Sequence, residues 1–281
     1  MPSNRQAFFN RAALCVGILA TSFLAEANAQ GLKVSTAVYN AGELDSNGRE
    51  PIVSSSVSLI HAGKAYDYVE AVGEVVIYEP SENRFVLLNP GRGLFTIIRF
   101  EELNRLLAAR APRIEEYLAE LKQAGAKEFA KTEQNLRFQL NPKFEQTLDA
   151  NSGTLRLNGP SWTYVAGTRE WQDEDQVRKY IQYTDWTARL NYVLHPSGLF
   201  PEPRLELNKA VLELKDRIPV FVQLSLRPDA TLVLRAEYQF TRGLADQERQ
   251  LISDWNAAIT SGQLKELPFR QYQEKTLASI R

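Results

Sequence analysis

The sequence predicts an α+β fold, in which a curved antiparallel β-sheet packs against helices. Residues 64–100 contain three β-rich runs separated by four-residue turns at 80–83 and 90–93, a pattern typical of a meander of antiparallel strands. Apolar residues recur at helical spacing over residues 100–123 and again over 173–194, which predicts two helices that pack against other elements.

The strands of the meander are apolar on both faces. Apolar residues are consecutive at 75–78 and 85–88, and nearly so at 94–98, although a sheet with one wet face alternates apolar and polar residues. Because successive side chains point to opposite faces, both faces of this sheet need cover. One arrangement places the sheet between two helical layers, or between helices and a second sheet. The other is a curved sheet around an apolar cavity that could hold a lipid.

Residues 1–29 have the pattern of a secretory signal peptide. Arg5 and Arg11 precede an apolar run at 12–25, and Ala27-Asn28-Ala29 forms a small-x-small cleavage site. The apolar run is shorter than the ~20 residues that span a bilayer. We therefore expect an exported protein, periplasmic or extracellular, without a transmembrane segment after signal removal. Residues 30–281 are expected to form one α+β domain, with a candidate sub-boundary at the Pro-rich connector near 200–204.

Composition excludes several kinds of chemistry. The only cysteine, Cys15, and the only methionine, Met1, lie within the predicted signal peptide, so its removal excludes disulfides, thiolate metal sites and thiol nucleophiles. The chain has 33 basic and 34 acidic residues, and nothing indicates a basic surface for nucleic acid. His61 and His195 lie far apart in the sequence, and no catalytic or phosphate-binding motif is present. We predict no catalytic residue, no metal ligand and no cofactor.

The remaining elements follow from periodicity and turn residues. The Ser54-Ser55-Ser56 run, within an expected strand at 52–61, suits a wet or edge position. Pro112 interrupts the first helical pattern, so we expect a kink or two abutting helices there. The helix at 173–194 is aromatic over much of its circumference, and it could close a concave sheet or lie in a packed core. Residues 205–214 fit either a strand or a helix. Other strands are predicted at 32–39, 136–140, 144–148, 154–157, 161–168, 219–227 and 231–240, and helices at 246–259 and in part of 264–281.

Three segments of the meander carry a family pattern: Lys64-Ala-Tyr-Asp-Tyr, Val76-Ile-Tyr-Glu-Pro and Arg84-Phe-Val-Leu-Leu. Together with the export signal, they resemble the periplasmic lipoprotein carriers of the LolA/LolB type. The resemblance implies a half-barrel-like antiparallel meander closed by helices, with an apolar cavity for acyl chains. This chain is longer than those carriers, and none of its residues maps onto a functional position of theirs, so the resemblance implies a fold and no site residues.

The predicted function is non-enzymatic binding of a lipid or other hydrophobic ligand, or of an envelope protein. One alternative is a structural or protein-interaction module of the envelope with a filled core, and another is a hydrolase whose carboxylates converge only in the fold. A cavity of several hundred Å³ would distinguish a carrier from a module packed at ordinary interior density. The candidate cavity residues, taken from one assumed sheet face and from the aromatic helix, are Val75, Ile77, Phe85, Leu87, Tyr183 and Trp186.

Overall fold

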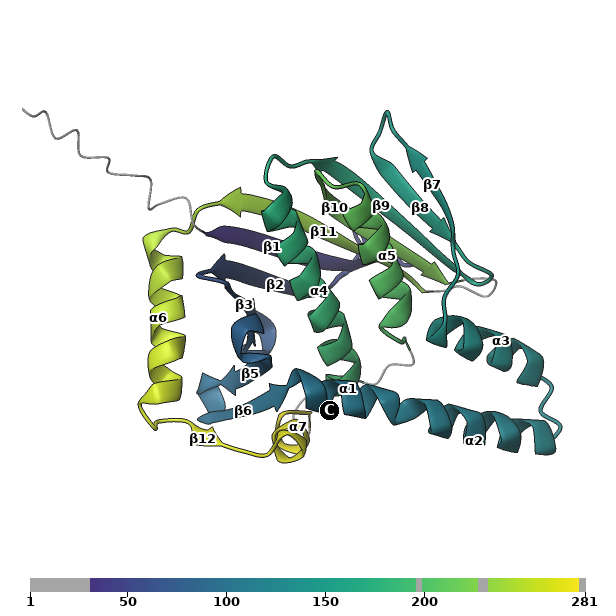
Figure 1. The fold of residues 1–281 in the computed structure, drawn as a ribbon, viewed down its shortest axis with the longest axis horizontal. Helices are drawn as coiled ribbons and strands as arrows, with labels where there is room; N and C mark the ends of the chain where they lie inside the picture. Colours follow the sequence, from purple (N-terminus) through teal and green to yellow (C-terminus); the bar gives the residue numbers. More distant parts are fainter. Residues whose placement is uncertain (1–30, 196–198, 227–231, 278–281) are drawn as a thin grey trace, which may run out of the picture.

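The computed structural model describes residues 31–195, 199–226 and 232–277, so the predicted signal peptide at 1–29 lies outside the described residues. Within these ranges, twelve strands form one sheet in the order β12-β6-β5-β4-β3-β2-β1-β11-β10-β9-β8-β7. Neighbouring strands are antiparallel, except that β12 is parallel to β6. The sheet is open, because its two end strands do not pair with each other (Figure 1). The predicted α+β class with an antiparallel sheet is confirmed.

The meander is the most regular part of the sheet, with four strands of six residues each. The strands are β1 (Leu32–Asn40), β2 (Ile52–His61), β3 (Lys64–Val69), β4 (Glu74–Glu79), β5 (Arg84–Asn89), β6 (Leu94–Arg99), β7 (Glu145–Asp149), β8 (Thr154–Asn158), β9 (Trp162–Glu170), β10 (Arg217–Leu226), β11 (Val233–Arg242) and β12 (Lys265–Glu266).

The helices follow the meander and then alternate with the later strands. They are α1 (Phe100–Ala108), α2 (Arg110–Gln123), α3 (Phe129–Leu140), α4 (Glu174–Leu194), α5 (Glu202–Glu213), α6 (Asp246–Thr260) and α7 (Phe269–Leu277). Figure 1 shows α4 and α5 lying over the strands β1, β11, β10 and β9. In the same view α6 lies at the left, beside the strands β1 to β6. None of the described helices combines the length and the apolarity needed to cross a membrane.

Three 3₁₀ turns join the meander strands at ten-residue intervals, at η2 (Glu70–Val72), η3 (Pro80–Glu82) and η4 (Pro90–Arg92). Each turn is followed by a residue in the left-handed region: Gly73 with φ 61°, Asn83 with φ 51° and Gly93 with φ 65°. Glycine adopts this conformation without a Cβ clash, and asparagine is among the few other residues that tolerate it. Because the turns recur every ten residues, the two strands that lie between them, β4 and β5, have the same length.

Both faces of the meander are covered by helices. Residues of β2 to β6 on one face pack against Ile252 and Trp255 of α6, forming a core of their own. Residues on the other face, including Tyr78 and Phe85, belong to the main core with α1 and α4. We call the face that α4 covers the inner face. At the meander, the structure thus has the arrangement with a helical layer on each side.

The register of the β4–β5 hairpin corrects the assumed sheet face. Val75 pairs with Leu88, so it shares a face with the even-numbered residues of β5 and not with Phe85 or Leu87. Ile77 lies on the same face as Val75, towards α6. Across the four-residue turn, each odd-numbered residue of β4 pairs with an even-numbered residue of β5. Side chains alternate between faces along each strand, so odd-numbered residues of the two strands lie on opposite faces. The prediction that these four candidates share one face is wrong.

Pro112 separates two abutting helices, as expected. α1 ends at Ala108 and α2 begins at Arg110, which places Pro112 in the first turn of α2. Proline is tolerated there because its missing N–H would have no partner in that turn, whereas inside a continuous helix its ring would clash with the carbonyl of Ala108.

One prediction for the later chain is corrected, and two other segments are assigned to a helix. Residues 136–140, predicted as a strand, form the last part of α3. Leu136 and Leu140 pack towards one cluster and Phe138 towards another, so the short apolar–polar alternation reflects a helix covered on two sides. The connector expected at 200–204 leads directly into α5, whose first turn includes Pro203. The ambiguous segment 205–214 also belongs largely to α5.

The packing of α6 gives a prediction for stability. Trp255 is 7 % exposed and packs against Tyr66 and Tyr68, with ring centroids 6.2 and 5.8 Å away. Trp255→Ala is expected to lower the free energy of unfolding by about 3 kcal/mol, measured by urea denaturation, because it removes apolar burial and leaves a cavity. Leu251→Ala on the same helix is the control, since Leu251 is 41 % exposed, and it should change stability by less than about 0.5 kcal/mol. Equal effects of the two substitutions would contradict this account of α6.

Candidate functional site

A cavity of about 820 Å³ lies between α4 and the inner face of the sheet. Its floor comes from β1 to β4 and from β9 to β11, and its roof comes from α4 and the start of α5. Several lining residues are exposed, among them Ser54, Val72, Asn191 and His195. The cavity therefore communicates with solvent near the start of β2, the β3–β4 turn and the end of α4.

Hydroxyl groups line much of the floor. Thr36 of β1 pairs with Ser56 of β2, and Ser54 and Ser58 lie two residues to either side on the same face. The sequence predicts a wet or edge position for the Ser54-Ser55-Ser56 run, but β2 lies between β1 and β3, inside the sheet. The prediction of an edge position is therefore wrong. The prediction of a wet position agrees with the structure, because alternate serines point into the cavity.

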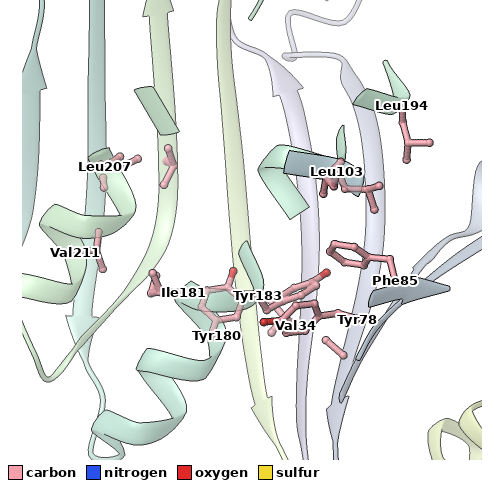
Figure 2. Packing of buried hydrophobic residues seen from close by; sticks show 14 of the residues in the cluster. Val34, Tyr78, Phe85, Leu103, Tyr180, Ile181, Tyr183, Leu194, Leu207 and Val211 are labelled. Atoms are coloured by element: carbon pink, nitrogen blue, oxygen red, sulfur yellow. The ribbon is translucent and has the colours of Figure 1, made fainter. Parts of the chain in front are cut away.

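One face of α4 forms the roof. Tyr180, Tyr183, Thr187 and Asn191 line the cavity, and their spacing of three to four residues places them on one side of the helix. Asp173 caps the start of the helix by accepting a hydrogen bond from the backbone N–H of Gln176 at 2.9 Å. Figure 2 shows the rings of Tyr180 and Tyr183 extending from α4 into the buried cluster near Val34 of β1.

Large side chains beside the cavity hold α4 away from its floor. The ring of Trp186 stacks on Phe100 of α1 with a centroid distance of 3.8 Å, and the ring of Tyr183 lies 5.8 Å from that of Tyr78. Several of the sheet positions beneath the roof carry small side chains, including Ala236 and the hydroxyl residues of β1 and β2. Small residues opposite a helix that is held by large contacts elsewhere leave the space unfilled.

Asp67 of β3 points into the cavity without a cationic partner among the described residues. Its Oδ1 accepts a hydrogen bond from the Ser58 hydroxyl at 2.7 Å, and the same hydroxyl lies 3.2 Å from that of Tyr183. Burial raises the pKa of Asp67, and the hydrogen bonds from Ser58 and Ser56 offset this only in part. Two hydroxyls satisfy the carboxylate, but no nearby charge neutralises it.

A second buried carboxylate of the meander, Glu79, has a lowered pKa where Asp67 has a raised one. Glu79 is 5 % exposed and forms ion pairs with Lys64 and Arg84. Burial opposes its charge, but the hydrogen bonds from these two cations outweigh that effect and lower the pKa of Glu79. Unlike Glu79, Asp67 lacks such partners, which makes it a candidate for contact with a ligand.

Glu74 of β4 lines the cavity on the same face as Asp67. Burial raises its pKa, offset in part by the hydrogen bond from Tyr272 and by the charges of His195 and Arg92. The Tyr272 hydroxyl donates to Glu74 Oε2 at 2.9 Å, and Tyr272 itself is fully buried. One oxygen of Glu74 is thus already used to attach α7 to the sheet.

Arg204 of α5 is the charged group on the opposite side of the cavity. Its Nε donates to Asn208 Oδ1 at 3.0 Å, and its Nη2 donates to the Tyr238 hydroxyl at 3.4 Å. Tyr164 and Tyr180 also line the cavity beside it. The lining further includes the apolar side chains Val38, Val69, Val76, Trp162, Leu194, Leu199, Phe200 and Leu224. The cavity therefore combines apolar surface with hydroxyls and separate charged groups.

Of the six candidate residues, only Tyr183 lies in the cavity lining. Trp186 is stacked on Phe100, and Phe85 and Leu87 are fully buried in the main core. Val75 and Ile77 lie on the other face of the sheet, against α6. The lining residues that sequence reasoning missed are mostly small or polar, and the signal that could have found them is the alternation of hydroxyl residues at 54, 56 and 58.

The structure offers no metal centre in the part of the chain that it describes, where no three His, Cys, Asp or Glu side chains cluster. His195 lies at the cavity mouth, while His61 at the end of β2 is outside the lining. Comparison of the sequence with protein-family models and with curated proteins found no match.

The raised pKa of Asp67 gives a prediction for the pH dependence of stability. A carboxyl whose pKa is higher in the folded state than in the unfolded state stabilises the fold at pH values below its ordinary pKa of 3.8. This stabilisation is lost as the pH rises through the folded-state pKa. Asp67→Asn should therefore raise the free energy of unfolding at pH 7, and the gain should shrink towards pH 3. Urea denaturation at both pH values measures it. An equal change at the two pH values would show that the carboxylate charge is not the cause.

Proposed function

We propose that this protein is a non-enzymatic binding protein that holds one amphiphilic molecule, a lipid or another ligand with a hydrophobic part, between α4 and the sheet. The observation that carries the proposal is the cavity of about 820 Å³, which lies within the range of small-molecule sites, ~300–1,000 Å³. Its mixed lining favours a ligand with both apolar and hydrogen-bonding groups, and not the purely apolar acyl chains that the sequence resemblance implied.

The lining supports binding over a purely structural role. Protein interiors pack closely, and voids larger than a few water molecules are rare. A cavity lined by hydroxyls, carboxylates and a guanidinium holds water or a ligand, because these groups need hydrogen-bond partners. The alternative, an envelope module with a filled core, does not account for this volume or for the exposed residues at the mouth.

The proposal extends to the shape of the sheet and to the location of the protein. In it, the twelve strands form a half-barrel that curves around α4, so that the helix closes the concave side. Residues 1–29 direct export, and the ligand is taken up in the periplasm or outside the cell. The position of α4 over β1, β11, β10 and β9 supports the half-barrel (Figure 1).

A hydrolase is the second candidate, favoured by one specific observation. Asp67 and Glu74 line the same wall of the cavity, and burial raises the pKa of each, as expected for a carboxylate pair that acts on a substrate. Binding is the better supported function, because Glu74 is tied to Tyr272 and Asp67 to Ser58. A bound ligand recovered chemically intact supports binding, whereas a cleaved product that disappears in Asp67→Asn would indicate the hydrolase.

A cavity-blocking substitution tests the binding function. Ala188 of α4 lines the cavity, so Ala188→Trp should fill part of it and weaken binding of the neutral fluorescent probe N-phenyl-1-naphthylamine by at least about tenfold, equivalent to ~1.4 kcal/mol. Ala119→Trp is the matched control, since Ala119 is exposed on α2, and it should leave the affinity unchanged. Circular dichroism melting confirms that both variants fold. The proposal fails if the parent protein does not bind the probe, or if both variants bind it as the parent does.

A further inference from the structure

Arg204 is held inside the cavity wall without a carboxylate partner. No Asp or Glu oxygen of the described residues lies within 4.0 Å of its guanidinium. Arginine stays protonated in proteins, and an unpaired guanidinium that is taken out of bulk water is costly unless another group compensates it. Such a group is therefore a candidate for contact with a negatively charged ligand.

The side chain of Arg204 is fixed in position from behind. Its Nε donates to Asn208, which is 1 % exposed and in turn donates to Asp185 Oδ1 at 2.7 Å and to Thr184 Oγ1 at 3.2 Å. Asp185 is the acidic group in this network. It is joined to Arg204 by hydrogen bonds through the amide of Asn208, and the two charges also interact from beyond ion-pair distance. These hydrogen bonds orient the guanidinium but leave the Nη atoms on the cavity side without an ionic partner.

Three tyrosines surround the guanidinium. Tyr238 of β11 accepts from Nη2 at 3.4 Å, and Tyr164 of β9 and Tyr180 of α4 lie close enough to the guanidinium to affect its pKa. Tyr164 and Tyr180 are 5 % and 3 % exposed, and their hydroxyls have no hydrogen-bond partner among the described residues. Burial raises the pKa of Tyr164 to about 12 and that of Tyr180 well above its usual value, so both hydroxyls are donors at neutral pH.

We propose that Arg204, with the hydroxyls of Tyr164, Tyr180 and Tyr238, binds the anionic headgroup of the amphiphile, a carboxylate or a phosphate. The guanidinium supplies charge-assisted hydrogen bonds with a planar geometry that suits both groups. The tyrosine hydroxyls supply further donors that the protein itself does not use. This inference rests on the proposed binding function and specifies the chemistry of the ligand.

The charge of Asp67 does not oppose this assignment. β2 and β1 separate β3, which carries Asp67, from β11, which carries Tyr238, so the two positions are three strand spacings of ~4.8 Å apart. Asp67 therefore lies apart from the Tyr238 side of the anion site, and Tyr180 is the member of the site on which its charge acts.

Paired ligands that differ only in headgroup charge test the proposal. The fluorescent fatty acid parinaric acid should bind the parent protein at least about tenfold more tightly than its methyl ester. Lysophosphatidic acid and monoacylglycerol, used as competitors, form the corresponding phosphate pair. A larger preference for the acid over its ester identifies a carboxylate headgroup. A larger preference for lysophosphatidic acid over monoacylglycerol identifies a phosphate headgroup. Either result supports the anion site.

Substitutions at the site assign the preference to Arg204. Arg204→Gln should remove the acid-over-ester preference while leaving ester affinity within about twofold, and Arg204→Lys should retain part of it. Tyr164→Phe should weaken only acid binding, by about threefold or more. Arg178→Gln is the control for loss of one positive charge, because Arg178 lies on the exposed side of α4, where its side chain is 58 % exposed. Circular dichroism checks the fold of each variant.

The outcomes separate this inference from the proposed function. If the parent shows no preference for the charged member of either ligand pair, or if Arg204→Gln keeps the preference, the anion site is wrong although the binding function stands. If neither the acid nor the ester binds the parent protein, the binding function fails and the anion site fails with it.

Discussion

The packing of α4 against the inner face of the sheet is the interaction on which the rest of the structure depends. The helix is held by aromatic contacts with α1, β4 and β11: Trp186 on Phe100, Tyr183 beside Tyr78, and Tyr180 beside Phe240 with a centroid distance of 5.2 Å. These contacts set how closely α4 can approach the strands. Because part of the floor beneath its lining face carries serine, threonine and alanine, including Thr36, Ser56 and Ala236, the same packing that stabilises the fold leaves the cavity open.

The two halves of the sheet have different roles because they are covered differently. The meander β3 to β6 is enclosed by α6 on one face and by α1 and α4 on the other, so its apolar residues form packed core. The neighbouring strands β1, β11 and β10 carry half-buried or exposed residues, such as Lys33 and Gln239, on their outer face. Their inner face contributes to the cavity. The rigid meander thus supports a less densely filled binding region beside it.

Much of the fold could be predicted from sequence, because its strongest signals are local. The turn residues at 80–83 and 90–93, the helical spacing at 173–194 and the proline at 112 each act within a few residues of their own position. The α3 helix was missed because Leu136, Phe138 and Leu140 alternate as strand residues do over so short a segment. The β4–β5 register was open to prediction, since a four-residue turn already determines which residues pair across the hairpin.

The site was harder to predict than the fold, for a physical reason. Long apolar runs mark the places where side chains fill space, so residues such as Leu87 and Ile77 were found in the core and not at the cavity. A cavity forms where side chains are too small to fill the space, and Ser56 or Ala236 becomes informative only when the residue facing it is known. Arg204 and Tyr238 are 34 positions apart in sequence, and only the tertiary structure brings them together.

Native mass spectrometry of the purified protein, kept in non-denaturing buffer, tests the central claim most directly. The account predicts a species heavier than the chain by one amphiphilic molecule, at near-unit stoichiometry, which is released on denaturation and found by solvent extraction. A mass equal to that of the chain alone, with no uptake of added fatty acid or of its ester, would contradict the account.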